Sequence, residues 1–436
     1  MEKIKIGVVG GLGHIGLIQA ACLAKLGYQT TAYDNNSFKM EIILRGKLPF
    51  YEPGLEELVK ETLKSGFLTF TSRSEDLGES DLVFICVGTP SLPTGEADTS
   101  QVYAAVEEVA RNRKKHGLAV IKSTVPVGTS RKLTAYLEEH KLSANITMVS
   151  NPEFLREGSG VEDFWQPSRI IVGASSEEAA KKVAGLYRPP GIKTIITSWE
   201  NAELIKYAGN TFLAAKISFI NEIAGMCETV NADIRIVSKG IGLDPRINPY
   251  FLEAGAGFSG PCLEKDLKAL INQFQKTGRK AKLLETVLEV NEGQRSAMVQ
   301  KLREQLGSLK GRRIAVLGMA FKAETDDVRD SHSLPIVKKL LSLEAELSIH
   351  DPWVKGLRQA GLSEDELPGA KWVHSPYEAV QGKDAALILT AWPEYRALDL
   401  LRVKDSMAYP LVVDGRNIFD PQDMRKLEIN YVGVGI

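Results

Sequence analysis

Short runs of apolar residues alternate with helix-like patterns from the start of the chain to about residue 195. The runs that we interpret as strands cover residues 4–9, 29–33, 82–87, 119–122 and 169–172. Nearly continuous Val- and Ile-rich runs separated by helical segments are typical of a parallel sheet that is buried on both faces. The pattern therefore predicts an α/β architecture for this part of the chain.

The pattern changes at residue 200. Apolar residues then recur at spacings of three and four to about residue 229, which predicts a long helix, and further helix is expected through residue 290. At Gly311 the alternation of strands and helices resumes. Predicted strands there cover residues 313–317, 345–350, 385–390 and 411–414, and a predicted helix covers 334–341.

Two α/β lobes are therefore expected on either side of a helical middle, since 436 residues exceed what one hydrophobic core usually organises. We expect two Rossmann-like, doubly wound domains at residues 1–199 and 306–436, joined by a long central helix within a helical region at 200–305. The two lobes could be distant versions of one architecture, although the sequence contains no short-period repeat.

Charge and hydropathy argue against several classes of partner. The formal net charge is −1, so neither a nucleic acid nor an anionic membrane surface would meet an excess of positive charge. No stretch of about 18 apolar residues lacks charges, so no membrane span is expected. The first residues run into an apolar strand without the pattern of a signal peptide, which favours a cytoplasmic location.

A glycine-rich turn follows the first predicted strand. Gly11, Gly13 and Gly16 fit the G-x-G-x-x-G fingerprint of dinucleotide-binding proteins, and a helical pattern follows directly. In that fingerprint the first glycine permits the tight turn, the second lets backbone approach a pyrophosphate, and the third allows close helix packing. Asp34 ends the next strand, where a carboxylate binds ribose hydroxyls and would repel a 2′-phosphate. These residues predict NAD as the cofactor, and His14 is interpreted as a tolerated loop residue.

The second lobe has a different turn after its first strand. Residues 318–322 read Gly-Met-Ala-Phe-Lys and lack the full fingerprint. One interpretation is a structural α/β turn, and the other is that Lys322 and Arg329 meet a different phosphate group. Spacing alone leaves both interpretations open.

The scattered cysteines show neither metal-ligand spacing nor a disulfide framework, so we expect thiols and no metal site. They are Cys22, Cys86, Cys227 and Cys262. Cys262 follows a glycine-rich loop and precedes a helical pattern, with Pro261 suited to the first turn of that helix. A helix N-terminus favours a thiolate, and Asp266 at i+4 would share the thiol's helix face. Cys262 is therefore a candidate nucleophile, although a lone cysteine is also commonly a small buried apolar residue.

Lys206 and Asn210 lie four residues apart on the predicted long helix, so they share one face of it. One interpretation is a solvated lysine beside an amide. The other is a cation and an amide that stabilise an oxygen atom as it gains negative charge during a reaction. The helical pattern alone does not decide between them.

Further motifs accompany the glycine turn, the cysteine loop and the long helix. They are residues 50–55 (FYEPGL), 87–90 (VGTP), 123–128 (STVPVG), 151–158 (NPEFLREG), 202–207 (AELIKY), 217–224, 321–322 with 325–329, and 414–416 (DGR). On these residues the chain resembles the UDP-glucose 6-dehydrogenase family of nucleotide-sugar dehydrogenases nearly from end to end. The resemblance implies two Rossmann-like domains joined by a long helix, an active site between the lobes, and dimerisation through the helical middle into a homodimer or higher homo-oligomer.

The resemblance also implies a four-electron oxidation of a nucleotide sugar, UDP-glucose to UDP-glucuronate, with NAD. In the implied mechanism Cys262 attacks the aldehyde made by the first oxidation and forms a thiohemiacetal. Hydride then passes to a second NAD, and the resulting thioester is hydrolysed. The covalent adduct would keep the carbon in place for the second transfer, whereas a released aldehyde would hydrate and escape.

The resemblance assigns roles to individual residues. The oxyanion would be stabilised by Lys206 and Asn210. Water would be positioned or activated, and protons moved, by Asp266, Thr124 and Glu153. NAD contacts are implied, beside the glycine turn, for Ile15, Asp34, Lys39, Thr89, Thr124, Glu157, Lys265 and Arg329. Nucleotide-sugar contacts are implied for Phe154, Leu155, Glu157, Lys206, Asn210, Phe251, Leu252, Gly257, Lys322 and Arg416, with Arg246 reaching in from a second subunit.

Two short segments depart from the family pattern. Where the family commonly reads Phe-Gly-Gly-Ser-Cys, residues 258–262 read Phe-Ser-Gly-Pro-Cys, and where it commonly reads Arg-Glu-Ser-Pro, residues 329–332 read Arg-Asp-Ser-His. The first change is expected to alter the sugar pocket or the hydrogen bonding of the thiol. The Cys-x-x-Lys-Asp spacing resembles UDP-glucose or GDP-mannose enzymes more than UDP-N-acetylhexosamine enzymes, and residues 246–252 favour UDP-glucose.

Parts of the pattern are compatible with other functions. These are the same chemistry on GDP-mannose or another UDP-hexose, a single-step NAD-dependent hydroxyacid dehydrogenase, and a non-catalytic dinucleotide-binding sensor. A hydroxyacid dehydrogenase would yield one NADH per substrate without using Cys262. A sensor would need Gly13 and Asp34 but would have no use for the thiol.

Overall fold

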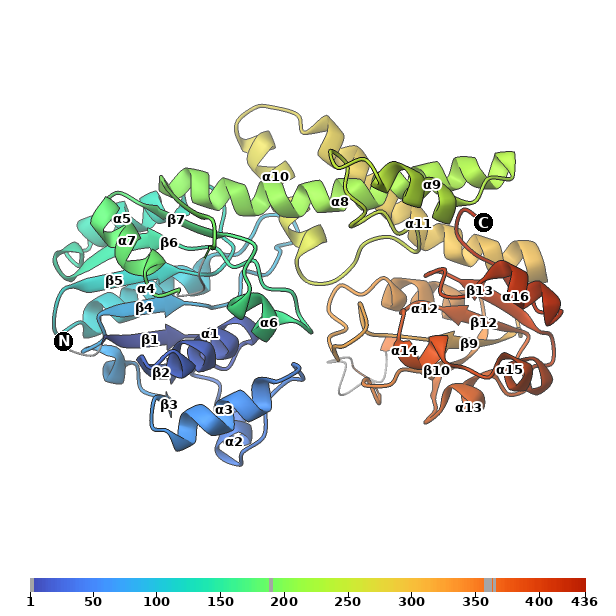
Figure 1. Ribbon diagram of the computed structural model, residues 1–436, viewed down its shortest axis with the longest axis horizontal. Helices are drawn as coiled ribbons and strands as arrows, with labels where there is room; N and C mark the ends of the chain where they lie inside the picture. Colours follow the sequence, from blue (N-terminus) through green and yellow to red (C-terminus); the bar gives the residue numbers. More distant parts are fainter. Residues whose placement is uncertain (1–3, 188–190, 357–362, 364–365) are drawn as a thin grey trace. The chain divides into compact units, whose positions relative to one another are not determined.

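The computed structural model describes residues 4–187, 191–356, 363 and 366–436 of the chain. The chain divides into two compact units, in which unit 1 is Met1–Gly209 with Lys268–Thr277, and unit 2 is Asn210–Leu267 with Gly278–Ile436. Figure 1 shows that each unit contains a sheet with helices around it. The three-domain division expected from the sequence stays a prediction.

Unit 1 is built on an eight-stranded sheet in the order β3-β2-β1-β4-β5-β6-β7-β8 (Figure 1). Its strands are β1 Lys5–Val9, β2 Gln29–Tyr33, β3 Leu68–Thr71, β4 Leu82–Ile85, β5 Gly117–Ile121, β6 Ile146–Ser150, β7 Ile170–Ala174 and β8 Thr194–Thr197. Neighbouring strands are parallel except β6 and β7, which are antiparallel. The strand order reverses between β1 and β4, and sheets of this kind bind ligands at the carboxyl ends of the strands beside that point.

Helices cover both faces of this sheet. They are α1 His14–Lys25, α2 Ser37–Leu44, α3 Leu55–Lys64, α4 Ser100–Asn112, α5 Thr129–Glu139, α6 Gly160–Trp165 and α7 Glu177–Ala184, with 3-10 turns η1 Ser74–Leu77 and η2 Ser143–Asn145. Alternate strand residues face different cores: Phe84 and Val120 pack in the cluster that contains α1 and α3, whereas Ile85 and Ile121 pack in the cluster that contains α4 and α5. The sheet is therefore doubly wound, as the apolar runs predict.

Unit 2 contains a six-stranded parallel sheet in the order β11-β10-β9-β12-β13-β14. Its strands are β9 Arg313–Leu317, β10 Glu346–His350, β11 Lys371–Trp372, β12 Ala385–Ile388, β13 Leu411–Asp414 and β14 Asn430–Val432. Its helices include α9 Ile234–Gly242, α11 Lys282–Leu306, α12 Ser333–Ser342, α13 Pro376–Val380, α14 Pro393–Arg396, α15 Leu400–Ser406 and α16 Pro421–Lys426. The order repeats that of the first six strands of unit 1, so the two lobes share one architecture.

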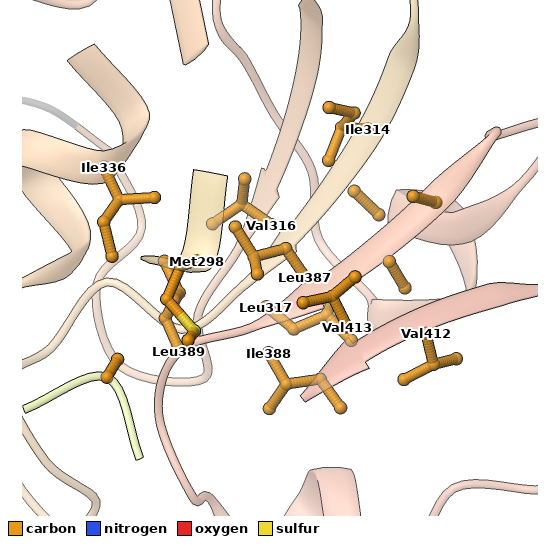
Figure 2. Packing of buried hydrophobic residues seen from close by; sticks show 14 of the residues in the cluster. Met298, Ile314, Val316, Leu317, Ile336, Leu387, Ile388, Leu389, Val412 and Val413 are labelled. Carbon is orange, nitrogen blue, oxygen red and sulfur yellow. The ribbon is translucent and has the colours of Figure 1, made fainter. Parts of the chain in front are cut away.

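The core of unit 2 is formed between its strands and the helices packed on them. Figure 2 shows Met298 of α11 and Ile336 of α12 among the side chains of Val316, Leu387 and Val413 from three adjacent strands. This core fixes the positions at which the strands end. It therefore also positions the loops that follow the strands and carry polar residues.

Two helices take part in both units. The predicted long helix is α8, Trp199–Val230, and α10 covers Leu263–Lys276. The α/β fold class with two Rossmann-like sheets and a long connecting helix is confirmed. The further helix expected through residue 290 is present as α9, α10 and α11; residues 243–262 between α9 and α10 form turns and loops, and α11 continues to Leu306. Within the described residues, no helix is both long and apolar enough to cross a bilayer.

Candidate functional site

The glycine turn of unit 1 joins β1 to α1 at the carboxyl edge of the sheet. Gly10 adopts a positive φ of 73°, and its carbonyl accepts a hydrogen bond of 3.0 Å from the Gly13 N–H. A Cβ atom on Gly16 would lie 2.1 Å from the Gly10 oxygen, and one on Gly11 would lie 2.8 Å from the Ala32 side chain of β2. Gly11 lies inside the turn that this hydrogen bond closes and leaves no space there for a side chain, Gly10 supplies the positive φ, and Gly16 allows close packing.

Asp34 follows β2 and faces this turn. Its carboxylate accepts hydrogen bonds of 3.0 Å from the backbone N–H groups of Leu12 and Asn36. A carboxylate offers about four acceptor positions, so Asp34 retains capacity for ribose hydroxyls. The residues that follow Asp34 contribute to a cavity of about 420 Å³, lined by Asn35, Ser37, Met40, Glu41, Leu44, Arg45 and Ser72. The turn, the carboxylate and the cavity together fit the adenosine end of a dinucleotide.

Predicted site residues also follow β4, β5 and β6, the strands on the other side of the reversal of strand order. Thr89 follows β4 and donates a hydrogen bond of 2.9 Å to the carbonyl of Thr124, which follows β5. Glu153 follows β6, and its carboxylate accepts from the Leu155 N–H at 2.6 Å. Because parallel strands end at one edge, residues far apart in sequence line one side of the sheet.

Lys206 of α8 forms a buried ion pair with Glu153 at 2.7 Å, and both residues are at most 6% exposed. The Lys206 ammonium also lies 5.3 Å from the centre of the Phe154 ring, and the Arg169 guanidinium lies 3.9 Å from the same centre. This excludes the interpretation of Lys206 as a solvated lysine. A buried pair of this kind holds a positive charge at a fixed place, which is useful for orienting an anionic or developing anionic group.

Three further predicted residues also lie in unit 1. Ile15 is in the first turn of α1, and Lys39 is in α2, where its backbone N–H donates to Asn36. Glu157 lies in the loop that also carries Glu153.

In unit 2, Cys262 directly precedes α10 and is exposed. Its carbonyl accepts a helical hydrogen bond of 2.9 Å from the Asp266 N–H, so the thiol stands at the helix N-terminus as predicted. Pro261 lies before the helix rather than in its first turn, which corrects that expectation. The other three cysteines are less accessible, and burial raises the pKa of Cys22 and raises that of Cys86 to about 12.

Asp266 is 1% exposed and accepts two short hydrogen bonds. The Asn210 amide of α8 donates to one carboxylate oxygen at 2.6 Å, and the Lys265 ammonium donates to the other at 2.6 Å. These bonds bring the predicted amide, the predicted carboxylate and the turn that carries Cys262 together within unit 2.

The loop before Cys262 is held by two asparagines that the sequence analysis did not single out. Asn291 of α11 accepts from the Phe258 N–H at 2.7 Å and donates to the Phe258 carbonyl at 3.0 Å. Asn221 of α8 accepts from the Gly255 N–H at 2.8 Å. Both asparagines are 1% exposed. The sequence signal that could have revealed these asparagines was an amide side chain within an apolar helix face. Such a group needs a hydrogen-bond partner when it is buried.

Gly257 and Arg416 also belong to this part of unit 2. Gly257 has a φ of +98°, and a Cβ atom there would lie 2.4 Å from the Asn291 side chain. Arg416 follows β13, and burial lowers the pKa of its guanidinium to about 10.

The remaining predicted residues of unit 2 are on its loops. The Lys322 ammonium lies 5.7 Å from the Phe321 ring centre, and the exposed Arg329 pairs with Asp327. Phe251 adopts a φ of +63°, and Leu252 is buried. Arg246 is on the surface and pairs with Asp244 at 2.6 Å.

The turn after β9 in unit 2 resembles the glycine turn of unit 1, but the carboxylate that faces it has different hydrogen-bond partners. Asp351 takes the place of Asp34 and accepts from the Met319 and Ala320 N–H groups at 2.8 and 3.0 Å. It also accepts from two N–H groups of its own loop and from the Trp392 indole at 3.2 Å. Five donors occupy this carboxylate, so it stabilises the turn and has no capacity left for ribose hydroxyls.

Family models match the chain in three consecutive segments. Residues 4–190 match the NAD binding domain of the UDP-glucose/GDP-mannose dehydrogenase family, residues 200–293 match its central domain, and residues 315–421 match its UDP binding domain. The chain belongs to the UDP-glucose/GDP-mannose dehydrogenase family.

Relatives of this family member match it over nearly its full length. The UDP-glucose 6-dehydrogenase of Rhizobium meliloti and the UDP-glucose 6-dehydrogenase TuaD of Bacillus subtilis are each 41% identical over 99% of the chain, covering 99% and 93% of their own lengths. A solved UDP-glucose dehydrogenase from Pyrobaculum islandicum is 37% identical with a TM-score of 0.91, and the match covers 100% of this chain and 98% of that one. These findings confirm the family resemblance, the enzyme class and NAD as the cofactor.

Proposed function

We propose that this protein catalyses the NAD-dependent, four-electron oxidation of UDP-glucose to UDP-glucuronate. The observation that carries the proposal is the exposed Cys262 at the N-terminus of α10, beside an Asp266 held by Asn210. It stands in a family member that is 41% identical to UDP-glucose 6-dehydrogenases. A nucleophilic thiol is useful when an alcohol is oxidised through an aldehyde to an acid, because the covalent adduct retains the aldehyde intermediate.

The residues that would hold NAD are those at the carboxyl edge of the first sheet. We propose that the backbone of the glycine turn meets the pyrophosphate at the N-terminus of α1, and that Asp34 binds the adenosine ribose. Thr89, Thr124, Glu157, Lys265 and Arg329 are proposed as further contacts. When bound, NAD accepts one hydride in each of the two oxidations.

Cys262 is proposed to act between the two oxidations. Its thiolate sulfur forms a bond to the C6 aldehyde carbon, and the carbonyl oxygen takes up the negative charge and then a proton. Loss of hydride from that carbon, together with loss of the hydroxyl proton, converts the thiohemiacetal into a thioester. Water then adds to the thioester carbonyl, the C–S bond breaks, and Cys262 leaves as thiolate beside the carboxylate product.

Charged and polar side chains are proposed to handle the oxyanion and the protons. Lys206 and Asn210, one turn apart on α8, would stabilise the C6 oxygen as it becomes negative. Asp266 would take a proton from the water that hydrolyses the thioester. Glu153 and Thr124 would position water and accept the proton of the substrate hydroxyl.

A panel of nucleotide sugars tests the substrate. With saturating NAD, we expect UDP-glucose to give a kcat/KM at least roughly tenfold higher than GDP-mannose, UDP-galactose or UDP-N-acetylglucosamine, followed by NADH absorbance. The preference would come from the residues proposed to contact the nucleotide sugar, which are Phe154, Leu155, Phe251, Leu252, Gly257, Lys322 and Arg416. A higher kcat/KM for GDP-mannose would reject UDP-glucose as the substrate while leaving the reaction class in place.

The family models support a separate function for each of three segments of the chain. We propose that residues 1–199 bind NAD, that 200–305 carry the thiol and the dimer contact, and that 306–436 bind the UDP part of the substrate. The cytoplasmic location inferred from the sequence stays a prediction.

We also propose that the chain forms a homodimer through α8. Phe212, Phe219, Met226 and Val230 are each more than half exposed, at spacings that place them along one face of the helix. Contiguous exposed apolar side chains of this size mark an association surface. The exposed Arg246 is proposed to reach the substrate of the second subunit.

Breaking this apolar face should separate the subunits. Light scattering of the wild-type protein should give twice the chain mass of 47.8 kDa, and the double variant Phe212→Asp/Phe219→Asp should give about one chain mass. Leu401→Asp, at an exposed apolar residue of α15, is the matched control and should remain dimeric. A Phe212→Asp/Phe219→Asp protein that keeps twice the chain mass would show that the dimer uses another surface.

A further inference from the structure

His332 joins three segments of unit 2 that are distant in sequence. The residue precedes α12 and is 0% exposed. Its Nε2 atom lies 2.8 Å from the Leu389 carbonyl oxygen, and its Nδ1 atom lies 2.8 Å from the Ser259 hydroxyl. The Arg416 guanidinium packs against the ring, with its NH2 atom 3.1 Å from Nδ1 and 2.9 Å from Nε2.

These contacts assign the proton on the imidazole. A carbonyl oxygen only accepts, so Nε2 carries the hydrogen that it donates to Leu389. Burial, with the nearby charge of Arg416, lowers the pKa of His332 well below its usual value, so the ring is neutral. Nδ1 therefore bears one lone pair, which accepts from the Ser259 hydroxyl, while the Arg416 NH2 group packs against the ring between the two nitrogens.

Arg416 is held by neutral groups. Its Nε donates to the Leu389 carbonyl at 2.9 Å, its NH1 atom lies 3.5 Å from the Gly257 carbonyl oxygen, and its NH2 reaches His332. Within the described residues it forms no ion pair. The guanidinium has five N–H groups, of which these contacts use three. A half-buried cation with two donors to spare and no ion pair among the described residues suits an anionic ligand, such as the diphosphate of a nucleotide.

Ser259 connects this cluster to the candidate nucleophile. Its hydroxyl is also 3.2 Å from the Phe321 carbonyl oxygen, and it lies three residues before Cys262 in the loop clamped by Asn291. Two of the four positions at which the chain departs from the commonly observed family sequence, 259 and 332, are thus in direct contact. The glycine at 259 and the proline at 332 of the common family sequence have no side chain that could form the Ser259–His332 hydrogen bond. The φ of −67° at His332 would itself accommodate proline.

We propose that Ser259 and His332 act as one positioning pair that fixes Arg416 for the nucleotide of the substrate. The pair sets the affinity of unit 2 for the nucleotide diphosphate, while the chemistry of Cys262 depends on it little. The proposal rests on the proposed function for the identity of the nucleotide, UDP.

Variants that keep or remove single hydrogen bonds test the pair by calorimetric titration with UDP. Ser259→Ala removes the hydroxyl, and His332→Gln keeps a donor for Leu389 but removes the acceptor for Ser259 and the ring that packs against Arg416. Each should raise the Kd for UDP and the KM for UDP-glucose by about tenfold, the effect of one hydrogen bond to a charged group, with kcat and the KM for NAD within about twofold. Ser259→Thr and His332→Asn, which retain a hydroxyl and an Nδ1-like acceptor, should restore most of the affinity.

The double variant Ser259→Ala/His332→Gln separates a shared role from two independent ones. Because both residues act through Arg416, its Kd should match that of the single variants rather than the product of their effects. Unchanged UDP affinity in Ser259→Ala, or equal losses of kcat and of both affinities with a lowered Tm, would overturn the pair. A wild-type protein that binds UDP but does not oxidise UDP-glucose would instead reject the proposed function and leave this test intact.

Discussion

Replacing Cys262 with alanine should lower the rate of UDP-glucuronate formation by a factor on the order of 10⁴ or more. Without the sulfur there is no adduct to hold the aldehyde, and hydrolysis of a thioester cannot occur. NAD binding should persist, because the glycine turn and Asp34 lie in unit 1 and make no use of the thiol. Product analysis by chromatography and NAD titration by fluorescence measure the two effects separately.

Two further variants test the same assignment of Cys262. Cys227→Ala removes a thiol that is 3% exposed in α8 and should leave acid formation intact. Asp266→Asn keeps Cys262 but removes the proposed acceptor of the water proton, so a covalent adduct should appear by intact-protein mass spectrometry during turnover. Acid formation at the wild-type rate in Cys262→Ala would remove Cys262 from the mechanism.

The second large effect is expected from Gly16→Ala. The added Cβ would stand 2.1 Å from the Gly10 carbonyl oxygen, so the turn between β1 and α1 must move. Overpacking of this kind costs about 1–3 kcal/mol, and displacement of the backbone that meets the pyrophosphate should weaken NAD binding by about 10- to 100-fold. Titration with NAD and thermal unfolding with and without NAD measure the loss.

Gly293→Ala is the matched control for this substitution. Gly293 is in α11, and an added Cβ meets no atom within 4 Å, so alanine should slightly stabilise the helix and leave NAD affinity unchanged. Wild-type NAD affinity in Gly16→Ala would mean that the turn does not contact the cofactor.

The elements of the fold could be predicted because their signals are local. The residues 29–33 and 313–317 read as strands and are strands, and the periodicity after residue 200 is that of α8. Spacing also placed Asp34 beside the glycine turn and Cys262 at the start of a helix. Apolar period and turn chemistry act within a few residues, so a single sequence carries them.

The partners of the site residues could not be predicted in this way. Asn210 and Asp266 are 56 residues apart, and Ser259 and His332 are 73 apart, so each pair meets only through the tertiary packing of unit 2. The positive φ at Gly10 rather than Gly11 likewise depends on how tightly the turn packs on β2. Such contacts are set by the tertiary structure rather than by local pattern.

The central claim is that one site takes a single sugar carbon through both oxidations. With limiting UDP-glucose and excess NAD, the final absorbance at 340 nm should correspond to two molecules of NADH for each UDP-glucose consumed, because the aldehyde stays bound to Cys262 until the second hydride has left. One molecule of NADH for each UDP-glucose, with an aldehyde released into solution, would contradict the account.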